Sequence, residues 1–192
     1  MMEYKHTLLY KKITGLADVS EADLDKLFNL ITVRQLKKGE IMLKPGQVCK
    51  NVYFVDTGYL RTFFNKGGIE INTAFTFENN FTSNPKSLRL GIPSDTAIEA
   101  GEKSVIYVFE GAALLRLYKE SPEIESFGRK LLEQLLIEQE EHANIFKLFT
   151  PAERYKYLQE NNPQMIQRVS LSQIASYLGV VRETISRIRK LK

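Results

Sequence analysis

The apolar residues near the end of the chain recur at helical spacing in two short segments, separated by a break. Residues 171–179 read Leu-Ser-Gln-Ile-Ala-Ser-Tyr-Leu-Gly, and residues 182–190 read Arg-Glu-Thr-Ile-Ser-Arg-Ile-Arg-Lys. Ala175 is small enough for two helices to cross closely, and Gly179 supplies the backbone freedom that a helix end needs at a turn. Four aliphatic residues fall where such helices would bury them against each other: Ile174, Leu178, Ile185 and Ile188. The pattern predicts a helix-turn-helix.

The polar face of the second segment is basic. Residues 170–192 contain five basic residues and one acidic residue, whereas residues 1–169 contain 22 of each sign. The whole formal excess of +4 therefore lies on the predicted helix-turn-helix. An ordinary amphipathic helix pair with a solvated charged face is the alternative, but this concentration of positive charge favours a polyanion as the partner. The polar residues in question are Arg182, Glu183, Ser186, Arg187, Arg189 and Lys190.

Two other periodicities precede this segment. Residues 16–31 have apolar positions at helical spacing, with Ser20 as a cap, and predict a helix. From residue 33 to about residue 109, short apolar runs alternate with glycine-containing turns, which predicts a small antiparallel barrel or jelly roll. Asn-Lys-Gly-Gly at residues 65–68 is typical of a hairpin tip.

A long helix is predicted to begin at Pro122, with Ser121 as its N-cap residue, and to run to about Phe149. Roughly 27 residues at 1.5 Å each span about 40 Å, which is long for a helix that serves one small domain. A heptad seam along this helix predicts a homodimer. The alternative is a helix that packs only on its own barrel. The seam residues expected at the dimer contact are Leu131, Leu135 and Ile145.

The next boundary is marked by a capping box. Thr150 and Glu153 flank a proline at the first helical position, so a helix is expected to begin here and to run through Leu158. Residues 165–169 are expected to form a short extended link. The resulting fold class is α+β. It has an N-terminal antiparallel β-roll or jelly roll in residues 1–120, a long central dimerisation helix in residues 121–149 and a C-terminal helix-turn-helix domain in residues 150–192.

Composition limits the classes of function. With 43% hydrophobic and 26% charged residues, the chain resembles a soluble globular protein. It has no apolar run of about 18 residues, so a cytoplasmic protein without a membrane partner is expected. A single cysteine, Cys49, and two histidines leave no expected disulfide, metal site or cofactor. Residues 33–109 contain no histidine, which argues against a metal-dependent barrel enzyme, and no catalytic grouping favours any other enzyme.

The order of a glycine-punctuated roll, a long helix and a helix-turn-helix resembles the Crp/Fnr family of bacterial transcription regulators. Residues 182–188, Arg-Glu-Thr-Ile-Ser-Arg-Ile, look like that family's recognition helix. The resemblance implies that Arg182, Glu183 and Arg187 contact base edges of double-stranded DNA. It also implies a cyclic-nucleotide-binding-like roll, a homodimer, and RNA polymerase as a further partner. A sensor whose helix-turn-helix contacts protein is the alternative. It would fit a neutral C-terminal segment better.

The chain departs from the family's pattern at two places. Family members that bind cyclic nucleotides have an arginine for the phosphate, and Asp95 stands there in this chain, followed by Thr96. A carboxylate repels a phosphate, and Gln139 and Glu140 replace the small hydroxyl residues expected near the purine. The effector, if there is one, is therefore not expected to be cyclic AMP. Val181 stands at the recognition helix's usual Ser/Thr cap.

Overall fold

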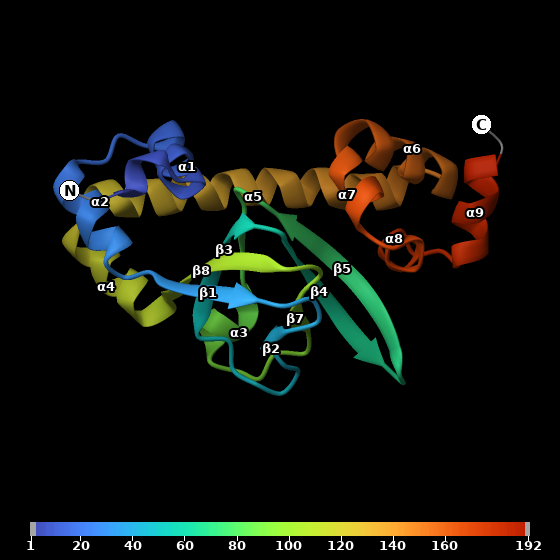
Figure 1. Ribbon diagram of the computed structural model, residues 1–192, viewed down its shortest axis with the longest axis horizontal. Coiled ribbons are helices and arrows are strands. Elements are labelled where there is room, and N and C mark those ends of the chain that lie inside the picture. The colour runs from blue at the N-terminus through green and yellow to red at the C-terminus, as the bar shows by residue number, and fades with distance from the viewer. Residues whose placement is uncertain (1–2, 191–192) are drawn as a thin grey trace. The chain divides into compact units, whose positions relative to one another are not determined.

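The structure is a computed structural model that describes residues 3–190. Its contacts divide the chain into two compact units: the first contains residues 1–61 and 76–134, and the second contains residues 62–75 and 135–192. Three elements run from one unit into the other, namely strands β4 and β5 and helix α5 (Figure 1). None of the helices described between residues 3 and 190 has the length and apolar character that crossing a membrane requires.

The N-terminal segment differs from the single helix predicted over residues 16–31. A 3-10 helix η1 (Glu3–His6) and helix α1 (Leu8–Leu16) precede helix α2 (Glu21–Phe28), and strand β1 begins at Thr32. The predicted helix is wrong at its start because Ala17 has extended backbone angles, which end α1. Ser20 is the N-cap residue of α2, as expected, although its side chain makes no capping hydrogen bond. Helix α1, which was not predicted, packs on the core through its buried side chains Leu9 and Ile13.

Two four-stranded antiparallel sheets confirm the predicted roll, with strand orders β1-β8-β3-β6 and β2-β7-β4-β5. Leu60, Ile98 and Ile106 belong to the buried cluster between their inward faces. Gly58 has a φ of +85°, and a Cβ there would lie 2.2 Å from Ser104 Oγ, so only glycine fits this turn. The strands are β1 (Thr32–Leu36), β2 (Ile41–Leu43), β3 (Asn51–Thr57), β4 (Tyr59–Lys66), β5 (Ile69–Phe77), β6 (Phe81–Thr82), β7 (Ala97–Ala100) and β8 (Ser104–Glu110).

The first unit also contains two further helices and the first half of a long one. Helix α3 (Pro85–Leu90) and helix α4 (Gly111–Glu120) were not predicted, whereas helix α5 (Pro122–Leu148) has almost the predicted bounds. Ser121 Oγ accepts a hydrogen bond from the Ile124 N–H and so caps α5. Ile124 and Phe127 then anchor the helix in a core cluster that also contains α1 and α2 residues.

The second unit contains four further helices: α6 (Pro151–Asn161), α7 (Pro163–Arg168), α8 (Leu171–Tyr177) and α9 (Arg182–Lys190) (Figure 1). The predicted capping box is confirmed, because Thr150 and Glu153 each bond the other's backbone N–H. The predicted extended link at residues 165–169 is wrong, since most of it is helical in α7. Pro163 stands at the first turn of α7, where its fixed φ suits a helix. The side chain of Met165 is buried and anchors the helix.

Candidate nucleic-acid interface

Helices α8 and α9 occupy the two segments that the sequence predicts as a helix-turn-helix, and the ends of α8 carry defined caps. Ser170 Oγ accepts a hydrogen bond of 3.3 Å from the Gln173 N–H at its start. At its end, Gly179 adopts φ +70°, and the Val180 N–H reaches back to the Ala175 carbonyl at 3.0 Å. With the Gly179 N–H bonded to the Ser176 carbonyl, this is a Schellman turn. The turn fixes the direction in which the chain enters α9.

The buried side of the pair is the predicted one. Ile185 of α9 is fully buried, and Ile174, Ala175 and Leu178 of α8 are buried with it, while Ile188 is half-buried. These contacts decide which face of α9 points away from the protein. Helix α9 begins without a side-chain cap, because Val181 stands at that position and is 65% exposed.

The opposite face of α9 carries the predicted DNA-binding residues. Ser186 is half-buried, and the charged residues are exposed: Arg182, Glu183, Arg187, Arg189 and Lys190. Among the ion pairs of the part of the chain that the structure describes, none involves these charged side chains. Lys192, which completes the basic segment, lies outside the described residues. The face is therefore a positive surface whose hydrogen-bond donors are available to a ligand.

Arg154, which the sequence did not single out, ties the helix-turn-helix to the end of α5. Its guanidinium donates to three backbone carbonyls: Phe146 at 2.8 Å, Phe149 at 3.0 Å and Leu178 at 3.1 Å. The same group lies 4.8 Å from the centre of the Phe146 ring. The last carbonyls of a helix have no intrahelical donor. The Arg154 side chain therefore supplies hydrogen bonds to carbonyls at the end of α5 and at the end of α8 together.

The four residues considered for an effector lie in different units. Asp95 and Thr96 precede β7 in the first unit, whereas Gln139 and Glu140 lie exposed on α5 in the second. Thr96 is buried and accepts a hydrogen bond from the Asn84 amide at 3.1 Å, which gives it a structural partner. Asp95 is exposed. Within residues 3–190, no group of three His, Cys, Asp or Glu side chains is placed to hold a metal ion.

The predicted dimerisation residues are half-buried within the single chain: Leu131, Leu135 and Ile145. Leu131 packs against the core of its own first unit. The most exposed apolar side chains of α5 lie elsewhere: Leu132 is 61% exposed, Leu136 is 70% exposed and Leu148 is 74% exposed. Leu132 and Leu136 are one helical turn apart and form a stripe that sequence periodicity alone did not distinguish from the predicted seam.

Solved structures of transcription regulators share this fold. FixK2 from Bradyrhizobium japonicum matches with a TM-score of 0.71 and 21% identity, covering 84% of this chain and 83% of that one. A putative regulator of the Crp/Fnr family from Eubacterium rectale matches with a TM-score of 0.66 and 20% identity, covering 91% and 83%. The c-di-GMP responsive global regulator CLP from Xanthomonas campestris matches with a TM-score of 0.66 and 17% identity, covering 89% and 90%.

These matches establish that the chain has a Crp/Fnr-like fold, as the sequence indicated. No protein-family model and no curated protein sequence matches the chain.

Proposed function

We propose that this protein is a transcription regulator of the Crp/Fnr type that binds double-stranded DNA in a sequence-specific manner. It acts as a homodimer in the cytoplasm, and its β-roll serves as the regulatory part. The proposal rests above all on α9, whose basic face is exposed and without ion-pair partners in the described chain while its apolar face is buried against α8. A helix held in this way fits the major groove.

The residues of α9 divide into two roles by their place on the helix. Arg182, Glu183 and Arg187 lie where a recognition helix enters the groove, and they read base edges. An arginine can bind guanine through two hydrogen bonds, and a glutamate can accept one from cytosine. Arg189 and Lys190 lie further along and bind phosphates, and Ser186 lies within the first group, between Glu183 and Arg187.

Dimerisation supplies the second copy of this helix. The stripe of Leu132 and Leu136 exposes apolar surface on a helix that is long enough to extend past one domain. Burying a leucine side chain stabilises an interface by about 1.5–3 kcal/mol, and a second copy of α5 offers the matching stripe. Leu131 and Leu135 lie beside this stripe and extend the contact, whereas Ile145 lies further along α5, in line with Leu131 and Leu135.

The effector of the roll is not expected to be cyclic AMP, because Asp95 presents an exposed carboxylate where a phosphate-binding residue is needed. The regulator CLP, which shares this fold, is described as c-di-GMP responsive, and this supports an effector other than cyclic AMP. RNA polymerase is the expected protein partner, since regulators of this type act at promoters.

The test begins with selection of bound duplexes from a random DNA pool, followed by affinity measurements on the selected operator and on random DNA. Replacing Arg187 by Ala should weaken operator binding by roughly 1–3 kcal/mol and relax the preference at one guanine. Replacing Lys190 by Ala should weaken binding to both DNAs about equally and lower the salt dependence by roughly one ion.

The Lys190 variant is the matched control, because it removes the same charge from the same helix. Equal losses on operator and random DNA for Arg187→Ala would contradict base reading. They would leave a non-specific basic segment, or the alternative in which the helix-turn-helix contacts a protein.

A further inference from the structure

Strand β5 has a free edge in the second unit. It is the last strand of the order β2-β7-β4-β5, so no described strand pairs with its outer side. Gly67 and Gly68, both with positive φ, form the two-residue turn between the end of β4 at Lys66 and the start of β5 at Ile69. Because backbone polar groups alternate between the two edges of a strand, those of Glu70 and Asn72 point away from β4.

One hydroxyl of the helix-turn-helix occupies this edge. Ser176 Oγ, on α8, accepts a hydrogen bond of 3.0 Å from the Asn72 N–H and donates one of 2.9 Å to the Glu70 carbonyl. A neighbouring strand would satisfy the same two groups with its own carbonyl and N–H. A hydroxyl is able to replace both, because it is a donor and an acceptor at once. The Ser176 side chain therefore stands in for a strand partner.

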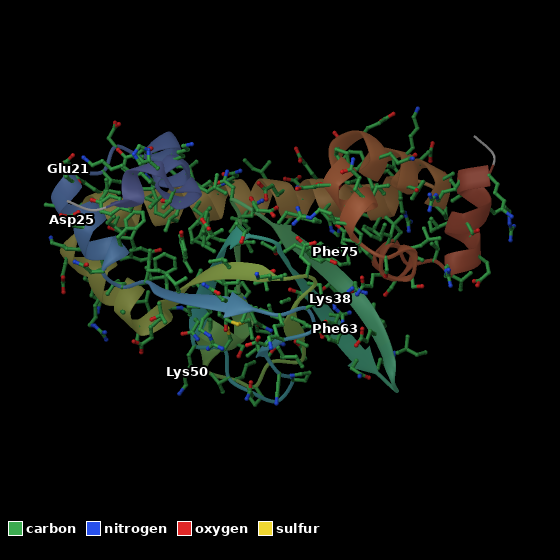
Figure 2. All side chains as sticks on the ribbon, viewed as in Figure 1. Glu21, Asp25, Lys38, Lys50, Phe63 and Phe75 are labelled. Atoms are coloured by element: carbon green, nitrogen blue, oxygen red, sulfur yellow. The ribbon has the colours of Figure 1, made fainter. Side chains whose placement is uncertain are left out.

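An aromatic cluster beside Ser176 strengthens the contact. The ring of Tyr177 lies edge-on to the ring of Phe75, at 5.5 Å between centroids. Phe75 lies on β5 and is labelled in Figure 2. On its other sides Tyr177 meets His142 at 5.3 Å and Phe146 at 6.3 Å. Burial raises the pKa of Tyr177 to about 12, so its hydroxyl stays neutral in this apolar setting. Aromatic pairs of this geometry are stabilising beyond the area that they bury.

The docked strand leaves the basic face of α9 accessible. Arg182 and Arg187 are exposed in the same structure in which Ser176 is bonded to β5. Arg154 meanwhile holds the end of α8 to the end of α5 through the Leu178 and Phe146 carbonyls. The helix-turn-helix is thus held at two places, by β5 through Ser176 and by α5 through Arg154, and neither contact competes with DNA.

We infer that the free edge of β5 is a docking site for α8 that fixes the orientation of the helix-turn-helix for DNA, with Ser176 as the positioning residue. The inference rests on the proposed function and adds a route for regulation. Because β5 continues from the second unit into the first, a change in the roll reaches the DNA-binding helices through this strand. Pre-orientation increases affinity because the free protein then has less freedom to lose on binding.

The experiment compares Ser176→Ala with Ser176→Thr, which keeps the hydroxyl. Amide hydrogen exchange on the free protein is measured first. The Asn72 amide should exchange at least about tenfold faster in Ser176→Ala than in the unchanged protein or in Ser176→Thr. Ser172→Ala is a second control, because Ser172 lies exposed on the same helix. Unchanged exchange at Asn72 in Ser176→Ala would overturn the docking contact.

Operator affinity is measured next. Losing one net hydrogen bond at the docking site should weaken operator binding by roughly 3- to 10-fold in Ser176→Ala, with the preferred bases unchanged. Ser176→Thr should restore the affinity. Affinity that is equal or higher in Ser176→Ala would overturn the positioning role. The exchange experiment needs no DNA, so it still tests the docking contact if the unchanged protein selects no operator and the proposed function fails.

Discussion

At the scale of single residues, Arg154 is the clearest case in which the local sequence does not reveal what a side chain contacts in the structure. It lies in the first turns of α6, where a cation opposes the helix dipole, so sequence reasoning finds no use for it. The structure supplies the reason, because its guanidinium satisfies three carbonyls from two other helices. Arg187 is the opposite case. Its exposure was predictable, because the buried position of Ile185 determines which face of α9 is exposed.

His142 gives a prediction about pH at this scale. It is half-buried on α5 between the rings of Phe146 and Tyr177, and its Nε2 has no hydrogen-bond partner among the described residues. Burial lowers the pKa of His142 from its ordinary value of 6.5, so the folded chain favours the neutral imidazole. This contribution to stability is present above pH 6.5 and is lost as the pH falls through the folded-state pKa.

We therefore expect the free energy of unfolding, measured with chemical denaturant, to fall between pH 7 and pH 5. His142→Phe keeps a ring in the cluster and removes the unpaired nitrogen, so it should make this pH dependence shallower and stabilise the fold by about 1 kcal/mol at pH 7. His6→Gln, at the exposed second histidine, should leave the slope as it is. A slope that survives in His142→Phe would assign the pH dependence to other groups.

At the scale of elements, the caps and turns were predictable, and several short helices, α3 and α7 among them, were not. Thr150, Ser170 and Gly179 each act within a few residues of their own position, so local sequence contains the whole signal. Helix α7 has only six residues, and it is stabilised by burial of Met165 and by packing against the neighbouring helices α6 and α8. A helix of that length is marginal without tertiary contacts, so its sequence alone does not reveal it.

The missing cap of α9 gives the prediction at this scale. Val181 is 65% exposed and leaves the first N–H groups of α9 without a side-chain acceptor. Val181→Ser should stabilise the protein by roughly 0.5–1 kcal/mol, because a serine hydroxyl accepts from the second or third helical N–H. Thermal unfolding measures the change, and Val181→Ala is the control that shortens the side chain without adding an acceptor. Equal melting temperatures for the two variants would show that the cap is not formed.

At the scale of the whole molecule, contacts join segments that a linear pattern keeps apart. The hydrogen bond between Asn72 and Ser176 links positions 104 residues apart. Nothing local in either segment marks it, whereas the predicted order of roll, long helix and helix-turn-helix followed from local patterns of apolar, capping and turn residues. The predicted division at residues 120 and 149 stays a prediction, and the contacts group residues 62–75 with the C-terminal helices.

The last prediction concerns the dimer, and the structure changes which leucines test it. Leu131 packs on its own core, so a charge there would also destabilise the single chain. Leu132 and Leu136 are exposed, and changing both to Glu should give a folded monomer in sedimentation velocity, because two carboxylates on the stripe repel those of the second copy.

Operator affinity should fall at least about tenfold in that variant, since each monomer then holds one half-site. The selected operator should contain half-sites about 10–10.5 bp apart, or a multiple of that distance, as a two-fold dimer requires. Leu148→Glu is the matched control, because Leu148 is equally exposed but lies on another side of α5, and it should leave the dimer intact. A dimer that persists after the Leu132 and Leu136 changes would place the contact on another face of the protein.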